Sequence, residues 1–201
     1  MKIPEWQKRM LDIAGACAGL LLFLPFFLII PFITLIESKG PVIYRRKVLG
    51  KNGKPFSAYK FRTMVQNADH FLEENREMKV RFLENFKLKE DPRITKTGRV
   101  LRKFSLDEIP QFVNVLRGEM SLVGPRIKTE EELECYGSSR EKILSVKPGL
   151  SGLWQVSGRQ EIPFSRRMEL DITYVDHASF WGDVGILLKT IPTILKGTGA
   201  H

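Results

Sequence analysis

Cysteine and histidine are scarce in this sequence. The two cysteines, Cys17 and Cys135, lie far apart, and none of the three histidines is near either of them. This spacing provides neither the paired cysteines of a disulfide framework nor the ligand pattern of a zinc site. The chain is therefore expected to work in a reducing compartment and without structural zinc.

Several motifs of common protein classes are also missing. The sequence contains no Walker loop, no Gly-x-Gly-x-x-Gly fingerprint and no Gly-x-Ser-x-Gly elbow. It also lacks helix-turn-helix spacing and interleaved aromatic and basic residues, so nucleic acid is not an expected partner. The net charge of +9, from 32 Lys and Arg against 23 Asp and Glu, nevertheless predicts an anionic partner. Phospholipid headgroups and a phosphorylated substrate both fit.

One long stretch has no charge at all. Residues 13–36 form an apolar run of 24 residues, which as a straight helix would span about 36 Å against a hydrocarbon core of about 30 Å. A signal peptide has a shorter apolar region of about 7–15 residues, and no small-x-small cleavage pattern follows Ile36. The stretch therefore predicts a retained membrane anchor.

Prolines and flanking charges bear on the path of this anchor. Pro25 lies at its midpoint and Pro31 follows within two turns, and a proline inside a helix removes a backbone hydrogen bond and kinks the helix. Positive charge normally marks the cytoplasmic end of a span, but here it flanks both ends. Two arrangements fit: a re-entrant helical hairpin kinked near Pro25, with both ends on the cytoplasmic face, or a single kinked span. The flanking basic residues are Lys8, Arg9, Lys39, Arg45, Arg46 and Lys47.

The remainder of the chain predicts one α-rich α+β domain with a small β-hairpin. The hairpin is expected in residues 40–63, where apolar and polar residues alternate on both sides of Gly50, Asn52 and Gly53. Helical spacing of apolar residues dominates most of the rest. The domain boundary is expected between a membrane segment, 1–38, and a globular domain, 39–201. Within that domain we predict a helix-rich stretch at 67–89, helices at about 97–104, 107–116, 165–176 and 180–195, and a short strand within 149–156.

Two adjacent carboxylates, Asp107 and Glu108, are the first candidates for chemistry. The structural alternative is a capping box formed by Ser105 and Glu108, in which the acids only stabilise a first turn. Pro110 favours a later start, because a helix that begins at Asp107 places this proline where its missing N–H costs nothing. Asp107 would then lie at a helix N-terminus that also favours phosphate, as an ionised nucleophile or magnesium ligand.

Basic residues in stiff loops are candidates for phosphate binding. A Gly-Pro turn directly precedes Arg126, and a guanidinium group binds phosphate oxygens in a bidentate way. A lone arginine after a turn is more often a surface charge, so the interpretation depends on several such residues acting together. Lys60, Arg62 and Arg159 carry the same two interpretations.

Three further residues have less specific signals. Asp171 and Asp183 are candidate supporting acids, although each taken alone is more often an ordinary carboxylate on a helix surface. Trp154 lies on an apolar strand, and we interpret it as a core residue rather than a platform for ligand stacking.

Five segments read together resemble the bacterial sugar transferase family, the monotopic phosphoglycosyl transferases. They run in the family's order, and the resemblance covers the chain from about Arg9 onward; the last segment looks most like the branch that acts on UDP-galactose or UDP-glucose. Two positions depart from the family pattern: Leu24 stands where a serine often precedes the hairpin proline, and Ile127 stands where a proline often follows the arginine. The segments are YKFRTM at 59–64, DPRIT at 91–95, SLDEIPQ at 105–111, NVLRGEMSLVGPR at 114–126 and KPGLSGLWQVSGR at 147–159.

The resemblance implies a reaction and a place for it. A UDP-sugar and polyprenyl (undecaprenyl) phosphate would give polyprenyl-diphospho-sugar and UMP, with Mg²⁺, as the first membrane step of surface glycan synthesis. It implies that Asp107 attacks the sugar-proximal phosphorus and that Glu108 binds magnesium with it or helps to deprotonate the acceptor. It also favours the re-entrant hairpin, with a catalytic domain on the cytoplasmic face of the bacterial inner membrane, against anionic phospholipid. The implied substrate-binding residues are Lys60, Arg102, Arg126, Arg159 and Asp171.

Two other functions are alternatives to the sugar-phosphate transfer. A non-catalytic, membrane-associated scaffold of a glycan assembly complex would use the basic face on anionic lipid and would give Asp107 no chemical role. A membrane-tethered nucleic-acid binder would leave both the acid pair and the Gly-Pro-Arg loop without a purpose, and it ranks last. The sequence does not determine the oligomeric state, and a homodimer is one alternative.

Overall fold

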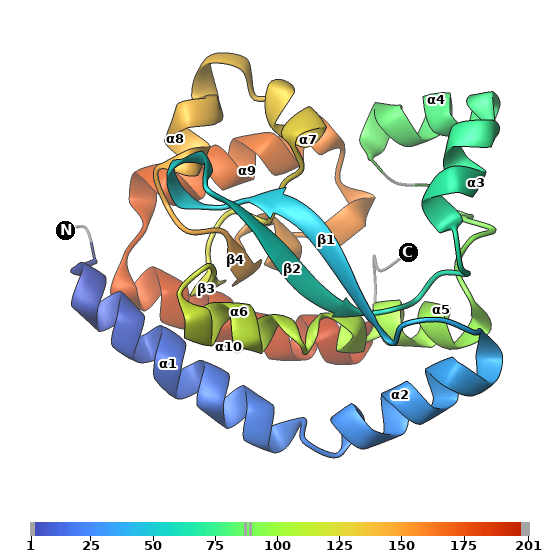
Figure 1. Cartoon of the computed structure of the whole chain (residues 1–201). Helices are drawn as coiled ribbons and strands as arrows, with labels where there is room; N and C mark the ends of the chain where they lie inside the picture. Colours follow the sequence, from blue (N-terminus) through green and yellow to red (C-terminus); the bar gives the residue numbers. More distant parts are fainter. Residues whose placement is uncertain (1–2, 87, 89, 198–201) are drawn as a thin grey trace.

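The computed structural model describes residues 3–86, 88 and 90–197 of the chain. Two small β-sheets lie within a shell of helices, and a bent pair of N-terminal helices runs along the lower side of the molecule (Figure 1). The fold is therefore the predicted α-rich α+β class. The helices are α1 (Glu5–Leu22), α2 (Phe26–Glu37), α3 (Ala68–Glu74), α4 (Arg76–Asn85), α5 (Lys96–Lys103), α6 (Gln111–Arg117), α7 (Glu130–Glu134), α8 (Arg140–Leu144), α9 (Phe164–His177) and α10 (Phe180–Lys196).

The apolar run predicted as a membrane anchor is two helices rather than one. α1 and α2 are bent by 60° relative to each other. Pro25 directly precedes α2, where the N–H that it lacks needs no helical partner, so the predicted kink is confirmed; Pro31, in contrast, lies inside α2. Among the described residues, no single helix is both long and apolar enough to cross a membrane, whereas this bent pair is, judged by length and composition.

Aromatic packing holds the break between α1 and α2. Phe23 stacks on Phe112 of α6, with 6.3 Å between the ring centroids, and Phe26 lies 5.9 Å from Phe23. A side chain at Gly19 would collide with the Phe112 ring, so this glycine permits the close approach of α1 to α6. The packed rings hold the break although Leu24 stands where the resemblance led us to expect a serine.

The predicted β-hairpin is confirmed. β1 (Ile43–Leu49) and β2 (Pro55–Phe61) pair antiparallel, with Ile43 opposite Phe61 and Leu49 opposite Pro55. The turn contains Asn52 at φ 58° and Gly53 at φ 71°, conformations that asparagine and glycine adopt at little cost. A second sheet pairs β3 (Ser121–Val123) with β4 (Gly149–Ser151) in parallel. β4 stands at the start of the segment where a strand was expected, but Trp154, expected on that strand, lies on the 3₁₀ turn Trp154–Val156; β3 was not predicted.

Two helix predictions need correction. The helix-rich stretch at 67–89 is broken at Asn75, whose side chain accepts the Met78 N–H and so starts α4 as a new helix; residues 87 and 89 lie outside the described part. The helix expected at 107–116 starts at Gln111, because residues Leu106–Glu108 form a separate 3₁₀ turn. The helices expected at 97–104, 165–176 and 180–195 are present as α5, α9 and α10, with ends shifted by at most one residue.

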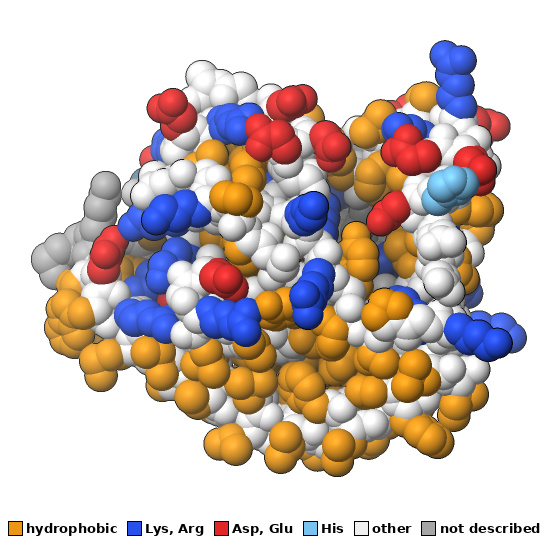
Figure 2. Space-filling view, in the orientation of Figure 1, with side chains coloured by type: hydrophobic (Ala, Val, Ile, Leu, Met, Phe, Trp, Pro, Cys, Tyr) orange, Lys and Arg blue, Asp and Glu red, His pale blue; other side chains and the backbone are white. Residues whose placement is uncertain are grey.

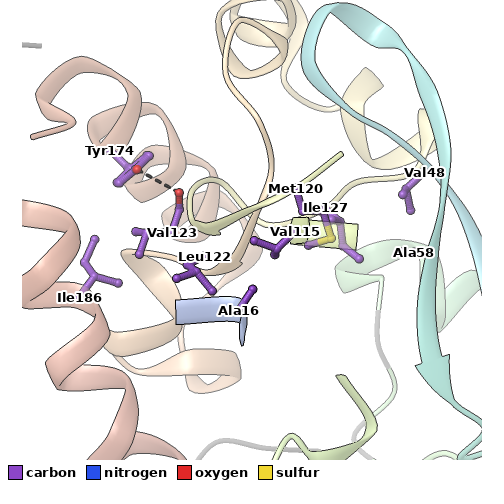
Figure 3. Close-up of a cluster of buried hydrophobic side chains, with 10 residues drawn as sticks. All are labelled: Ala16, Val48, Ala58, Val115, Met120, Leu122, Val123, Ile127, Tyr174 and Ile186. Atoms are coloured by element: carbon purple, nitrogen blue, oxygen red, sulfur yellow. Dashed lines mark hydrogen bonds between the residues drawn. The ribbon is translucent and has the colours of Figure 1, made fainter. Parts of the chain in front are cut away.

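One buried cluster joins the N-terminal segment to the rest of the protein. Ala16 of α1 packs with Val115 of α6 and with Leu122 and Val123 of β3 (Figure 3). The Tyr174 hydroxyl of α9 donates to the Val123 carbonyl at 3.1 Å, the dashed line in Figure 3. The hydrophobic core therefore crosses the boundary expected at residue 38.

Hydrophobic side chains also cover an exposed face. They gather over the lower side of the molecule, around α1 and α2, and a row of Lys and Arg side chains lies directly above them (Figure 2). α10 has a buried side at Ile186 and an exposed apolar side. A large exposed apolar patch marks an interaction site for a protein or a membrane. Its members include Leu28, Phe32 and Ile36 of α2 and Trp181, Leu188, Ile191 and Leu195 of α10.

Candidate active site

A cavity of about 2020 Å³ connects the charged residues singled out by the sequence to the apolar helices. One part of its wall is apolar and includes Leu22 and Phe23 of α1 and the break, and Ile191 of α10. The other part is strongly charged. It contains Lys60, Arg102, Asp107, Glu108, Arg126 and Arg159, which are all the site residues that the family resemblance implied except Asp171.

The acid pair lies on the 3₁₀ turn Leu106–Glu108, which follows Ser105 in the left-handed region at φ 54°. Ser105 makes no capping bond; instead its hydroxyl accepts a hydrogen bond from Arg159 at 2.7 Å. The capping-box alternative is therefore wrong. Pro110 takes the N-cap position of α6, so its missing N–H is harmless there, as the interpretation of a late helix start required.

Glu108 is held by two cations from distant parts of the chain. Lys60 of β2 lies 2.6 Å from its carboxylate, and the two terminal nitrogens of Arg126, in the loop after β3, bind both carboxylate oxygens. Burial works to raise the pKa of Glu108, but the charges and hydrogen bonds of Arg126 and Lys60 outweigh it and hold this pKa well below its usual range. Glu108 is therefore ionised and fixed in place.

Asp107 differs from its neighbour. Its side chain is buried, and it makes no hydrogen bond or ion pair with the part of the chain that the structure describes. Burial raises the pKa of Asp107, Glu108 adds to this effect, and Lys60 and Arg102 oppose it. The sequence predicted an ionised carboxylate at a helix N-terminus; the structure instead gives a buried carboxyl on a 3₁₀ turn that loses its proton less readily.

The two carboxyl groups fit a magnesium ion. Mg²⁺ in proteins is bound by one or two carboxylates together with substrate phosphates and water, and two adjacent acids on one turn supply that number. The Asp107 oxygens are uncommitted, and an ionised carboxylate has about four lone-pair positions, of which Glu108 uses three for Lys60 and Arg126. No group of three or more His, Cys, Asp or Glu within the described ranges forms a closed metal site.

Arg102 and Arg159 complete the cationic wall. Arg102, on α5, donates from Nε to the Thr63 hydroxyl at 2.9 Å. α5 packs tightly on this residue, because a side chain at Gly98 would overlap the Thr63 backbone. Burial lowers the pKa of both arginines, as expected for cations withdrawn from water before an anion arrives.

Asp171 supports the site from behind. It is only 1% exposed, and it accepts hydrogen bonds from Lys128 at 2.9 Å and the Tyr136 hydroxyl at 2.8 Å, with the Arg126 backbone N–H at 3.4 Å. Asp171 is not part of the cavity lining, and these contacts support the Arg126 loop; the substrate-binding role implied for it stays a prediction. Asp183 lies elsewhere, on α10, where it pairs with Lys8 of α1 and accepts a hydrogen bond from the Tyr174 hydroxyl of α9.

Among the cavity residues that were not predicted as site residues, Trp154 and Arg167 form a contact of their own. Trp154 is buried, as its interpretation as a core residue requires, yet it also lines the cavity. The guanidinium of Arg167 lies over its ring at 5.5 Å and donates to the Ile162 carbonyl. Arg167 precedes Asp171 by four residues on α9 and so shares its face, a spacing that could have identified it.

Comparison with known proteins identifies the class of this site. The family model described as bacterial sugar transferase matches residues 3–197. The exopolysaccharide production protein ExoY of Rhizobium meliloti is 43% identical over 203 residues, covering 99% of this chain and 90% of that protein. The chain therefore belongs to the bacterial sugar transferase family, as the sequence resemblance predicted, and it is an enzyme of that family.

Other relatives are longer. The UDP-galactose-lipid carrier transferase of Erwinia amylovora is 44% identical over 201 residues, which cover 98% of this chain and 42% of that protein. The undecaprenyl-phosphate galactose phosphotransferase of Salmonella typhimurium is 41% identical with the same coverage. The chain thus spans less than half of these two relatives and nearly all of ExoY.

Proposed function

We propose that this enzyme transfers a hexose 1-phosphate from a UDP-sugar to undecaprenyl phosphate and releases UMP, as an early step of exopolysaccharide or capsule synthesis. The names of the relatives from Erwinia and Salmonella support a UDP-galactose donor and an undecaprenyl phosphate acceptor. The observation that carries the proposal is the unpaired Asp107 carboxyl beside Glu108, Lys60, Arg102 and Arg126. This group lies among cations in the part of the wall that we propose receives the diphosphate.

The proposed reaction has two displacements at one phosphorus. An Asp107 carboxylate oxygen forms a bond to the sugar-proximal phosphorus, and the bond from that phosphorus to the bridging oxygen breaks, so that UMP leaves with the electron pair. A phosphate oxygen of the lipid then attacks the same phosphorus and returns the carboxylate to Asp107. The intermediate lets a single site serve a soluble donor and a membrane-bound acceptor in turn.

The chain's own cations make these steps feasible. A carboxylate that approaches a diphosphate meets negative charge, and fixed donors in a buried site stabilise the charge that develops. Arg126 is presented by a loop that Asp171 holds from behind, and Lys60 is fixed through Glu108. A magnesium ion held by Asp107 and Glu108 would supply further neutralisation of phosphate charge.

The cavity has room for both substrates. Pockets for one small molecule usually measure about 300–1,000 Å³, and this one measures about 2020 Å³. Its apolar wall lies at α1, the helix break and α10, next to the exposed apolar face. A phosphate headgroup could reach Asp107 while its chain stays against the apolar wall.

A mass measurement tests the covalent step. Protein incubated with UDP-galactose and Mg²⁺, without lipid acceptor, should gain the mass of a hexose phosphate on Asp107. Asp107→Asn should lose this adduct and at least about a thousandfold of the turnover, because it removes the nucleophile. Asp176→Asn, which changes an exposed acid paired with Lys142, serves as the matched control and should behave as wild type. An active protein without any adduct refutes the mechanism, and an Asp107→Asn variant that works normally in cells favours the scaffold.

The membrane arrangement can be tested separately. We propose that α1 and α2 enter the bilayer as a re-entrant hairpin from the cytoplasmic face, supported by the 60° bend and the exposed apolar side chains. Single cysteines in a Cys17→Ala, Cys135→Ala background at Trp6 and Lys39 should react with an impermeant maleimide from the same side of inverted vesicles. Reaction from opposite sides would refute the hairpin and establish a span.

A further inference from the structure

Charged side chains on one turn of α1 hold the strand that leads to Arg126. The Asp12 carboxylate accepts the backbone N–H of Leu122 and the hydroxyl of Ser121, both at 2.8 Å. One helical turn earlier, Lys8 donates to the Val123 carbonyl at 2.9 Å. β3 has a single strand neighbour, β4, so side chains of α1 supply much of the remaining support for its backbone.

Arg9, which directly follows Lys8, contacts α6. Both terminal nitrogens of Arg9 donate to carbonyls at the end of α6, to Val115 and Leu116, each at 2.6 Å. The last carbonyls of a helix have no partner inside the helix, so Arg9 satisfies groups that otherwise need water. α6 begins three residues after Glu108, so α1 contacts both the strand that leads to Arg126 and the helix that follows the Glu108 turn.

These contacts are shielded from water. Asp12 is only 2% exposed, and Lys8 also pairs at 2.5 Å with Asp183, which is fully buried. Glu5, one turn earlier on the same helix, makes an ion pair with Lys51 whose partners are exposed by 89% and 37%. Exposed pairs contribute little, whereas a buried N–H that loses its acceptor is costly.

The link from β3 to Arg126 is short and stiff. Gly124 and Pro125 alone separate Val123 from Arg126. A Cβ at Gly124 would lie 2.6 Å from the Lys147 carbonyl, and the Pro125 carbonyl accepts the Gly149 N–H at 2.7 Å. A shift of β3 therefore passes to the guanidinium that grips Glu108.

We propose that Asp12 is a positioning residue for the transfer reaction: through the Leu122 N–H and the Ser121 hydroxyl it sets the place of Arg126 in the site. The inference rests on the proposed function for its kinetic consequences. Under this proposal, the contact of α1 with β3 helps to set the geometry of the charged part of the cavity wall.

Kinetics distinguish positioning from a loss of folded protein. In Asp12→Ala, the KM for UDP-galactose in a UMP-release assay should rise about tenfold or more, because the phosphate-binding arginine is displaced. Asp12→Asn keeps an acceptor oxygen and should stay within about threefold of wild type, and Glu5→Gln should match wild type. Loss of folded enzyme alone lowers the maximal rate and leaves KM unchanged, so a wild-type KM in Asp12→Ala overturns the proposal.

Hydrogen exchange gives a second measurement that needs no activity. In full-length protein in nanodiscs, amides of residues 121–126 should exchange faster in Asp12→Ala, while those of α9 stay protected. Uniform acceleration, or none at 121–126, overturns the proposal. If Asp12→Ala does not fold, Ser121→Ala removes one of the two donors and should give a smaller effect in the same segment. If wild type releases no UMP, the proposed function fails, and the exchange pattern still decides the role of Asp12.

Discussion

Two parts of the same cavity wall are held in different ways. In the charged part, Lys60 and Arg126 each donate to specific carboxylate oxygens of Glu108. In the apolar part, Phe23 packs against Phe26 and Phe112, with ring centroids 5.9 and 6.3 Å from its own, and these contacts use no hydrogen bond or ion pair. The first arrangement depends on which atoms are present, and the second depends on whether a volume is filled.

This difference predicts how each part responds to change. A hydrogen-bonded ion pair loses its geometry when one donor is removed, and the partner is left buried and uncompensated. A packed ring tolerates another apolar group of similar size, because dispersion and burial have little directional demand. Conservative substitutions should therefore be harmful in the charged part and mild in the apolar part.

Glu108→Gln should have the largest effect of the substitutions that test this comparison. It frees Lys60 and Arg126 from their shared anion, and we expect turnover to fall by about a hundredfold or more. The pH profile should change as well. Asp107 must be deprotonated to attack, and the Glu108 charge helps to raise its pKa, so without that charge the pKa falls.

The acid limb of kcat/KM should therefore move to lower pH in Glu108→Gln, since this limb reports the ionisation of the free enzyme. The measurement is UMP release over a range of pH for both proteins. A limb that stays in place or moves to higher pH would contradict the assignment of Asp107 as the titrating nucleophile.

Arg126→Lys should have an intermediate effect. It retains the charge but not the planar fork that binds both oxygens of Glu108. We expect a loss of about ten- to a hundredfold in kcat/KM for the UDP-sugar, with the fold intact by circular dichroism. Arg117→Lys is the control, because Arg117 donates to the Tyr59 hydroxyl in an exposed contact and does not bind the acid pair. Equal activity of Arg126→Lys and wild type would show that charge alone is sufficient there.

Phe23→Leu should have the smallest effect. It exchanges one apolar side chain for another at the helix break, where the contacts are ring packing against Phe26 and Phe112. We expect a stability loss of about 1 kcal/mol and activity within about threefold of wild type in thermal unfolding and UMP-release assays. A loss as large as that of Arg126→Lys would remove the distinction between the two parts.

Local signals in the sequence were sufficient for some elements. The β-hairpin followed from alternation around a glycine-rich turn, and the bend at Pro25 followed from a missing N–H, so both needed only neighbouring residues. Helix starts were less certain: Ser105 has a positive φ, and its hydroxyl is engaged by Arg159, 54 residues away. No local pattern contains that contact.

The site showed the same limit. Motif order brought together Lys60, Arg102, Asp107, Glu108, Arg126 and Arg159, and the cavity contains all six. The direction in which Asp171 faces and the pKa of Asp107 depend on burial, and burial depends on tertiary packing. Asp171 faces Lys128 and Tyr136 rather than the cavity, and the pKa of Asp107 is raised because the folded chain removes it from water.

The bend between α1 and α2 also concerns the mechanics of the bilayer. α2 has 12 residues and is therefore about 18 Å long, not far from half of a hydrocarbon core of about 30 Å. A bent pair that enters from one face displaces lipid in that leaflet and leaves the opposite leaflet unchanged. Such a one-sided wedge relieves stretching in an outwardly curved leaflet, and inserted amphipathic segments respond to curvature for this reason. Under the proposed arrangement, the shape of the membrane contributes, together with its lipid charge, to where the enzyme accumulates.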